Sequence, residues 1–173
     1  GKDKGRLSGS FETNSIFYHQ DSKTAAIVPE DNFGSNNYLK LDYYRGKFSA
    51  GVQMEGYLPV LQGYPTNLTK AGLTNYYAQW VDDSFSVTAG TFYDQFGSGL
   101  LFRSWEERAL GLNNAIVGAR VTYNYEDIVS FKALWGLPRF GMGVFTNSTQ
   151  RENTITNTET QVRGADLSLA ISN

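Results

Sequence analysis

Apolar and polar residues alternate with a period of two along most of this 173-residue chain, which is the pattern of β-strands with two different faces. The clearest case runs from Lys47 to Leu58, where Phe48, Val52 and Met54 alternate with polar or glycine positions. Apolar residues at helical spacing over eleven or more positions are not evident in the chain. The pattern therefore predicts an all-β protein.

The alternation predicts eight strands in a single domain that covers residues 1–173. They span residues 6–18, 37–45, 47–58, 73–82, 84–93, 117–124, 129–136 and 162–172. Most are about 9 to 13 residues long, whereas an ordinary globular strand averages about 5 or 6. Tilted strands of about 9 to 11 residues are the length that crosses a lipid bilayer.

Short and long connections alternate along the chain. The short ones are the polar turns at 45–47, 82–83 and 126–127, and the long ones cover 19–36, 59–72, 95–114 and 137–160. In an up-and-down meander this order puts every tight turn at one end and every long loop at the other. Bacterial outer-membrane barrels have this asymmetry, with the short turns in the periplasm. The expected fold is thus an up-and-down antiparallel transmembrane β-barrel in the outer membrane.

Composition supports this interpretation and excludes other classes. Lys and Arg number 15 against 17 Asp and Glu, a net charge of −2, and charged residues make up 18% where about 25% is usual in soluble domains. The absence of a basic cluster argues against a nucleic-acid partner. The absence of cysteine excludes disulfides and thiolate zinc sites. The chain has no run of 18 apolar residues, so a membrane-spanning helix is not expected.

Aromatic residues gather near the predicted strand ends and flank uncharged positions occupied by Ala, Val, Leu, Met and Gly. The proposed girdle consists of Tyr43, Trp80, Phe85, Tyr93, Tyr123 and Trp135, with Tyr57 and Tyr76 near the same levels. An apolar band between two aromatic girdles predicts contact with outer-membrane lipid and lipopolysaccharide. The alternative is a soluble β-sandwich, which has no need to confine charge to one face of such long strands.

One stretch carries a family resemblance. Residues 96–115 (FGSGLLFRSWEERALGLNNA), the following 116–120 and the segment Tyr57-Leu58-Pro59 are similar to uncharacterised outer-membrane β-barrel proteins of Bacteroidetes. The resemblance implies a fold and a location and no activity. It also implies a barrel longer than 173 residues, of which this chain is the N-terminal part.

Charged residues are expected to meet inside the barrel. The 95–114 loop carries Arg103, Glu106, Glu107 and Arg108, and the inward strand positions carry Glu55, Asp94, Arg120 and Lys132, with Lys40 and Asp42 as further candidates. Many other inward positions are Gly, Ser or Thr, which would leave an eight-stranded interior underfilled. We therefore expect the loop to fold inside as a plug and further strands to widen the barrel. A closed eight-stranded barrel is the alternative.

The candidate chemistry is non-enzymatic. Neighbours such as Glu106 and Glu107 point to different sides of a strand or helix, so they do not predict an acid and base pair. His19 is the single histidine and has no nucleophile motif beside it, so neither a Ser-His site nor a metal or cofactor is expected. The leading hypothesis is a structural or scaffold barrel that associates with other outer-membrane proteins. The alternative is a transport channel for a small solute, plugged by the 95–114 loop.

Overall fold

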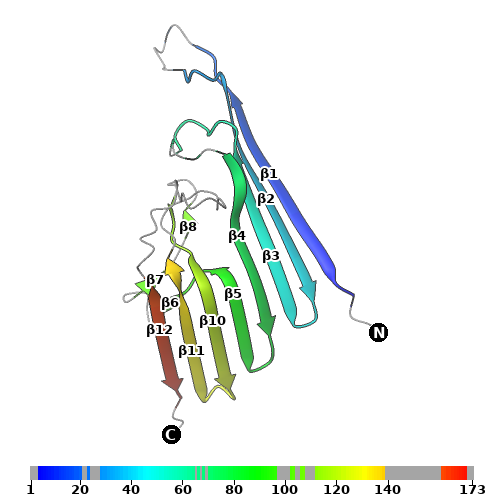
Figure 1. The fold of residues 1–173 in the computed structure, drawn as a ribbon, viewed down its shortest axis with the longest axis vertical. Coiled ribbons are helices and arrows are strands. Elements are labelled where there is room, and N and C mark those ends of the chain that lie inside the picture. The colour runs from blue at the N-terminus through cyan, green and yellow to red at the C-terminus, as the bar shows by residue number, and fades with distance from the viewer. Residues whose placement is uncertain are drawn as a thin grey trace.

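Eight long strands form one antiparallel up-and-down sheet (Figure 1). The computed structural model describes residues 4–20, 23, 28–64, 66, 68, 70–96, 102–103, 106–107, 112–138 and 161–170. The strands, in their order across the sheet, are β1 (Arg6–Phe17), β2 (Phe33–Arg45), β3 (Phe48–Tyr57), β4 (Lys70–Val81), β5 (Phe85–Phe92), β10 (Ile116–Tyr125), β11 (Val129–Pro138) and β12 (Val162–Leu169). This confirms the predicted all-β, eight-stranded meander.

Two predicted boundaries were wrong. Strand β2 begins at Phe33 rather than at residue 37, because its polar segment 34–37 continues the pairing with β1. Strand β4 begins at Lys70 rather than at residue 73, and Thr74 is a bulge between Gln53 and Met54 of β3. The buried Thr74 donates its hydroxyl to the Gln53 carbonyl at 3.1 Å. A bulge interrupts the period-two pattern, which is why the start of this strand is hidden in the sequence.

The sheet is open. Its edges are β1 and β12, and the described residues of these two strands do not pair with each other. The closed eight-stranded barrel that was the alternative expectation is therefore not what the structure contains. In Figure 1 the three hairpin turns lie together at the lower end of the sheet, and the strand ends that lead into the longer connections lie at the upper end, as the alternating connection lengths predicted.

The strands are staggered as well as paired. Cross-strand partners lead from Arg6 of β1 step by step through Tyr44, Ser49, Gln79, Thr88, Arg120 and Leu134 to Gly164 of β12. Eleven residues of β1 lie beyond Arg6 toward the loop end, but two residues of β12 lie beyond Gly164. Strand tilt in a curved sheet arises from a progressive stagger of this kind.

The two faces of the sheet have the opposite burial from that of a soluble sandwich. On β3 the apolar Val52 and Met54 are 39% and 42% exposed, while the polar Gln53 and Glu55 between them are 9% and 2% exposed. We call the exposed apolar side the outward face and the covered polar side the inward face. No second layer of described residues covers the outward face, so the sandwich expectation does not hold for this part of the chain.

Small apolar clusters on the inward side replace a conventional core. Phe92, Ile116 and Leu134 pack with Val162 near the loop end of β5, β10, β11 and β12. Tyr57 packs on Leu68 of the following connection, with Val60 and Tyr64 around them. The Tyr57 cluster holds part of the connection between β3 and β4 against the sheet at the end away from the hairpins.

Three glycines lie side by side across β5, β10 and β11. Gly118 of β10 pairs with Gly90 of β5 and with Gly136 of β11. A Cβ on Gly118 would lie 2.0 Å from the Trp135 carbonyl oxygen, and Gly90 has a φ of +108°. Glycines at such positions let strands approach and curve, which larger residues would prevent.

Candidate functional site

The outward face carries rows of exposed aromatic side chains near the hairpin end. Phe48 lies opposite Trp80, and Phe85 lies opposite Tyr123, which in turn lies opposite Phe131. Five of the six proposed girdle residues lie on the outward face and are at least partly exposed: Tyr43, Trp80, Phe85, Tyr123 and Trp135. Tyr93 is also partly exposed, but it follows β5 and lines a groove on the inward face. Tyr57 is different, because it is buried on the inward side, so its grouping with the girdle was wrong.

Charge is nearly absent from the outward positions of the eight described strands. By the pairing registers, the charged residues there are Arg45 and Arg163, and each sits at or next to the end of its strand. The positions between them are apolar, aromatic, Gly, Ser, Thr or Asn. The outward face therefore has an uncharged middle and charged margins.

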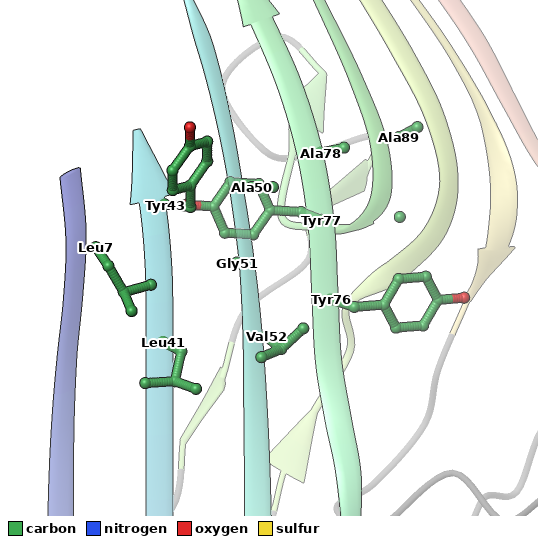
Figure 2. A pocket seen from close by; sticks show the side chains of 11 residues that line it. Leu7, Leu41, Tyr43, Ala50, Gly51, Val52, Tyr76, Tyr77, Ala78 and Ala89 are labelled. Atoms are coloured by element: carbon green, nitrogen blue, oxygen red, sulfur yellow. The ribbon is translucent and has the colours of Figure 1, made fainter. Parts of the chain in front are cut away.

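A shallow groove crosses the middle of this face (Figure 2). Ala50, Ala78, Ala89 and Ala119 pair in one row across β3, β4, β5 and β10. The first three line the groove, which has a volume of about 570 Å³, together with larger side chains such as Val52. Alternation alone predicts that each alanine faces outward. Their alignment in one row depends on the pairing registers of several strands, so it could not be predicted from the sequence.

On the inward face, three of the predicted charged residues meet. Asp94, which follows β5, accepts from Lys132 Nζ at 2.7 Å and pairs with Arg120 Nη1 at 3.3 Å. Its side chain is 7% exposed. Lys132 Nζ also donates to the Gln95 carbonyl at 2.6 Å, which holds the start of the 95–114 segment over the inward side of β11. Such a carboxylate is stabilised by its two cations in surroundings where screening by water is weak.

Arg120 is anchored by more than its ion pair. Its guanidinium lies 5.4 Å from the centre of the Phe92 ring, and Nη2 donates to the Thr88 hydroxyl at 3.4 Å. Its Nε is buried and has no hydrogen-bond partner among the described residues. One carboxylate thus faces two cations, and one guanidinium donor is unsatisfied.

Glu55 belongs to a separate cluster. It accepts from Gln53 Nε2 at 3.1 Å and from the Tyr57 hydroxyl at 2.6 Å, all on β3. Among the described residues Glu55 therefore lies apart from the Asp94 network, and two neutral donors from its own strand face bind its oxygens. Its expected contact with the charged 95–114 segment involves side chains outside the described residues.

A third polar group joins β2, β3 and β4. The Tyr77 hydroxyl donates to Asp42 Oδ1 at 2.9 Å, and Lys40 Nζ lies 3.6 Å from Asp42 Oδ2. Tyr77 lies over Gly51, where a Cβ would be 2.5 Å from both Tyr77 Cε1 and Asp42 Oδ1. Lys40 and Asp42 were among the sequence candidates, but Tyr77 was missed because nothing in the sequence places its ring beside them.

Comparison with known proteins adds a family and no activity. The whole chain, residues 1–173, matches DUF6029, a family of unknown function. The chain belongs to this family. Comparison with curated proteins and with solved structures gives no match. The function of this DUF6029 chain must therefore be argued from its own residues.

The predicted plug lies partly outside the described residues. Two short ladders occur in the 95–114 segment, where β6 (Gln95–Phe96) pairs with β7 (Phe102–Arg103) and β8 (Glu106–Glu107) pairs with β9 (Leu112–Asn113). The backbones of Arg103, Glu106 and Glu107 thus lie in strands, while their side chains and all of Arg108 lie outside the described residues.

Catalytic and metal chemistry find no constellation in the part of the DUF6029 chain that the structure describes. That part holds no group of three or more His, Asp or Glu residues that could bind a metal ion. His19 is exposed just beyond β1. The part that the structure describes also contains no helix that is long and apolar enough to cross a membrane. The two faces of the sheet are therefore the features from which function is argued.

Proposed function

We propose that this chain forms part of the wall of a bacterial outer-membrane β-barrel, with a structural or scaffold role and no enzymatic one. The observation that carries the proposal is the exposed, uncharged outward face of the eight-stranded sheet. In water, exposed apolar patches larger than a few hundred Å² are rare on monomeric proteins. In a bilayer the same side chains replace contacts with water by contacts with lipid tails, which are favourable.

The aromatic rows and strand-end arginines support the same orientation. Phe48, Trp80 and Tyr123 lie near the hairpin end, and Trp135 lies nearer the loops. Aromatic rings prefer the level of the lipid headgroups, and long cationic side chains reach out of the apolar layer from strand ends. Arg45 and Arg163 have this placement, since neither lies in the middle of its strand.

The open edges support a barrel larger than these eight strands. An unpaired strand edge within a bilayer leaves backbone N–H and C=O groups without partners, at a cost of several kcal/mol per group. β1 and β12 must then pair with further strands, and the stagger across the sheet supplies the required tilt. The inward charges have both signs and pair locally, whereas an ion-selective pore uses rings of one sign. This favours a scaffold over an ion channel.

Single-cysteine labelling of the full-length protein tests the proposal, and residues 1–173 contribute no cysteine that would compete for the label. Val87 and Val121 pair on the outward face, and Ser86 and Thr122 pair beside them on the inward face. Each residue is changed to Cys, labelled with a bimane dye and placed in liposomes. We expect brominated lipid to quench the dye at 87 and 121, and aqueous iodide to quench it at 86 and 122. Equal iodide quenching at all four positions would contradict the proposal.

A transport channel for a small solute is the second candidate. The observation that favours it is a polar groove of about 220 Å³ on the inward face, next to Asp42 and Tyr77. Deleting residues 98–112 and recording single-channel currents separates the two functions. A plugged channel gains conductance on deletion, whereas a scaffold barrel stays silent.

A further inference from the structure

The inward groove exists because β4 and β5 separate. Their pairing ends at Tyr77 and Gly90, and the φ of +108° at Gly90 turns β5 away from its neighbour. Beyond that point the Tyr76 amide donates to the Thr91 hydroxyl at 3.4 Å. The gap between the two strands opens toward β2 and β3 and forms the groove.

The side chains around the groove are rich in paired donors and acceptors. The polar ones are Lys40, Asp42, Gln53, Asn75, Tyr77, Thr91 and Tyr93. They comprise one cation, one carboxylate, two amides and three hydroxyl groups, of which two belong to aromatic rings. The two charges lie 3.6 Å apart and balance each other. A charged ligand would break this balance, so the groove favours a neutral ligand with many hydroxyl groups.

Two of these polar groups are held in place before any ligand arrives. Asp42 is fixed by the Tyr77 hydroxyl at 2.9 Å and by Lys40. Gln53 is fixed because its Nε2 donates to Glu55 Oε1 at 3.1 Å, which leaves its amide oxygen as an acceptor. Preorganised polar groups bind with a smaller loss of side-chain freedom. The rings of Tyr77 and Tyr93 add apolar surface on which C–H groups can pack.

We propose that this groove binds one ring of a neutral sugar. Sugars offer adjacent hydroxyls to carboxylate and amide groups and an apolar ring face to aromatic residues, which are the groups gathered here. Drug-sized ligands occupy pockets of about 300 to 1,000 Å³. A groove of about 220 Å³ suits a smaller ligand, such as a single ring. The inference rests on the proposed function, because a barrel makes the inward face a water-filled lumen that solutes reach.

Saturation-transfer NMR on the full-length protein in detergent micelles tests the inference. The probe is methyl α-D-glucopyranoside, and L-alanine serves as a small zwitterionic comparison. We expect the parent protein to transfer saturation to the sugar ring protons. The dissociation constant for the sugar should be at least tenfold larger in Asp42→Asn and in Asn75→Ala. The control variant Ser130→Ala changes an inward residue of β11 away from the groove and should bind like the parent protein.

The possible failures are distinguishable. Suppose that quenching of the bimane dye alternates between outward and inward positions as described above, but the parent protein transfers no saturation to the sugar. The sugar site is then wrong, and the proposed barrel is unaffected. The same conclusion follows if both groove variants bind like the parent, or if L-alanine binds more tightly than the sugar. If quenching of the dye does not alternate, the proposed function is wrong, and the sugar inference is wrong with it.

Discussion

The hydroxyl of Tyr77 on β4 donates a 2.9 Å hydrogen bond to Asp42 Oδ1 on β2, across the intervening strand β3. The Tyr77 ring lies beside Gly51 of β3 (Figure 2), and the lack of a side chain at Gly51 makes room for the ring and for Asp42. An aromatic ring packed over a strand glycine covers backbone that would otherwise be exposed. This contact links three strands by side chains in addition to the backbone ladders.

Changing Tyr77 to Phe should lower the free energy of unfolding by about 1 to 3 kcal/mol. The ring keeps its place over Gly51, but the buried, charged carboxylate of Asp42 loses the hydrogen bond that the Tyr77 hydroxyl donates. Urea titration of the refolded protein in micelles measures the effect. The control Tyr123→Phe removes a hydroxyl from the outward face and should change the free energy by less than about 0.5 kcal/mol. Equal effects of the two changes would contradict the bridge.

The sequence predicted the strands and their faces much better than it predicted the contacts between side chains. A period of two is a local property, so the outward positions of β3 could be assigned without knowledge of its partners. The Tyr77 bridge and the row ending at Ala119 depend on register across several hairpins, and the bulge at Thr74 shifts that register by one residue. Opposite charges in inward positions are consistent with the meeting of Asp94 and Lys132, but they gave no sign of the hydrogen bonds that Glu55 accepts from Gln53 and Tyr57. Neutral donors satisfy Glu55, and charge patterning carries no signal for them.

An arginine in the middle of the outward face should be costly only if that face meets lipid. Ala119 is exposed and lies mid-strand between Ala89 and Trp135. In a bilayer Ala119→Arg should lower the free energy of unfolding by about 2 to 4 kcal/mol, and Tyr125→Arg near the hairpin by about 0 to 1 kcal/mol. The measurement is equilibrium unfolding from liposomes. At an exposed site in water, Ala119→Arg should change the free energy of unfolding by less than about 0.5 kcal/mol. An effect that small in liposomes would contradict lipid contact at Ala119.

Removing the charge of Asp94 should be the most damaging single change on the inward face. Asp94→Asn removes the carboxylate that Arg120 and Lys132 share and leaves the two cations close together. Breaking a buried ion pair in this way costs about 3 to 5 kcal/mol. Asp166 of β12 is the matched control, because it is exposed and lies opposite Lys132, and Asp166→Asn should cost about 1 kcal/mol or less. If thermal unfolding shows the two variants to be equally stable, the Asp94 network is not structural.

The ion pair between Lys47 and Asp82 should give the hairpin end a pH-dependent stability. The hydrogen bond from Lys47 lowers the pKa of Asp82 below its usual 3.8, and the same bond raises the pKa of Lys47 above its usual 10.5. The contribution of Asp82 is complete above pH 3.8 and is lost as the pH falls through its lowered pKa. That of Lys47 is complete below pH 10.5 and is lost as the pH rises through its raised pKa.

The melting temperature of Asp82→Asn should therefore lie below that of the parent protein between about pH 4 and pH 10. The difference should shrink at more acid and more alkaline pH. Asp31 is exposed in the connection before β2, and Asp31→Asn serves as the control with no such profile. High salt should narrow the difference too, because both partners are exposed and screening weakens their attraction. A difference that is constant from pH 3 to pH 11 would show that the pair contributes nothing.

The hairpin between β10 and β11 should become more stable when its turn receives residues that suit its backbone. Glu126 and Asp127 have φ values of +44° and +56°, and the Ile128 amide donates to the Tyr125 carbonyl at 2.8 Å. Consecutive positive φ angles favour Asn followed by Gly, whereas a side chain in the left-handed region costs about 1 to 2 kcal/mol for most residues. The double change Glu126→Asn with Asp127→Gly should raise the free energy of unfolding by about 1 kcal/mol. Asp83→Gly in the β4–β5 turn is the control, since that residue has no positive φ and should gain nothing from glycine. Denaturant unfolding of both variants decides the point, and a loss of stability in the double variant would mean that the charged side chains hold this turn.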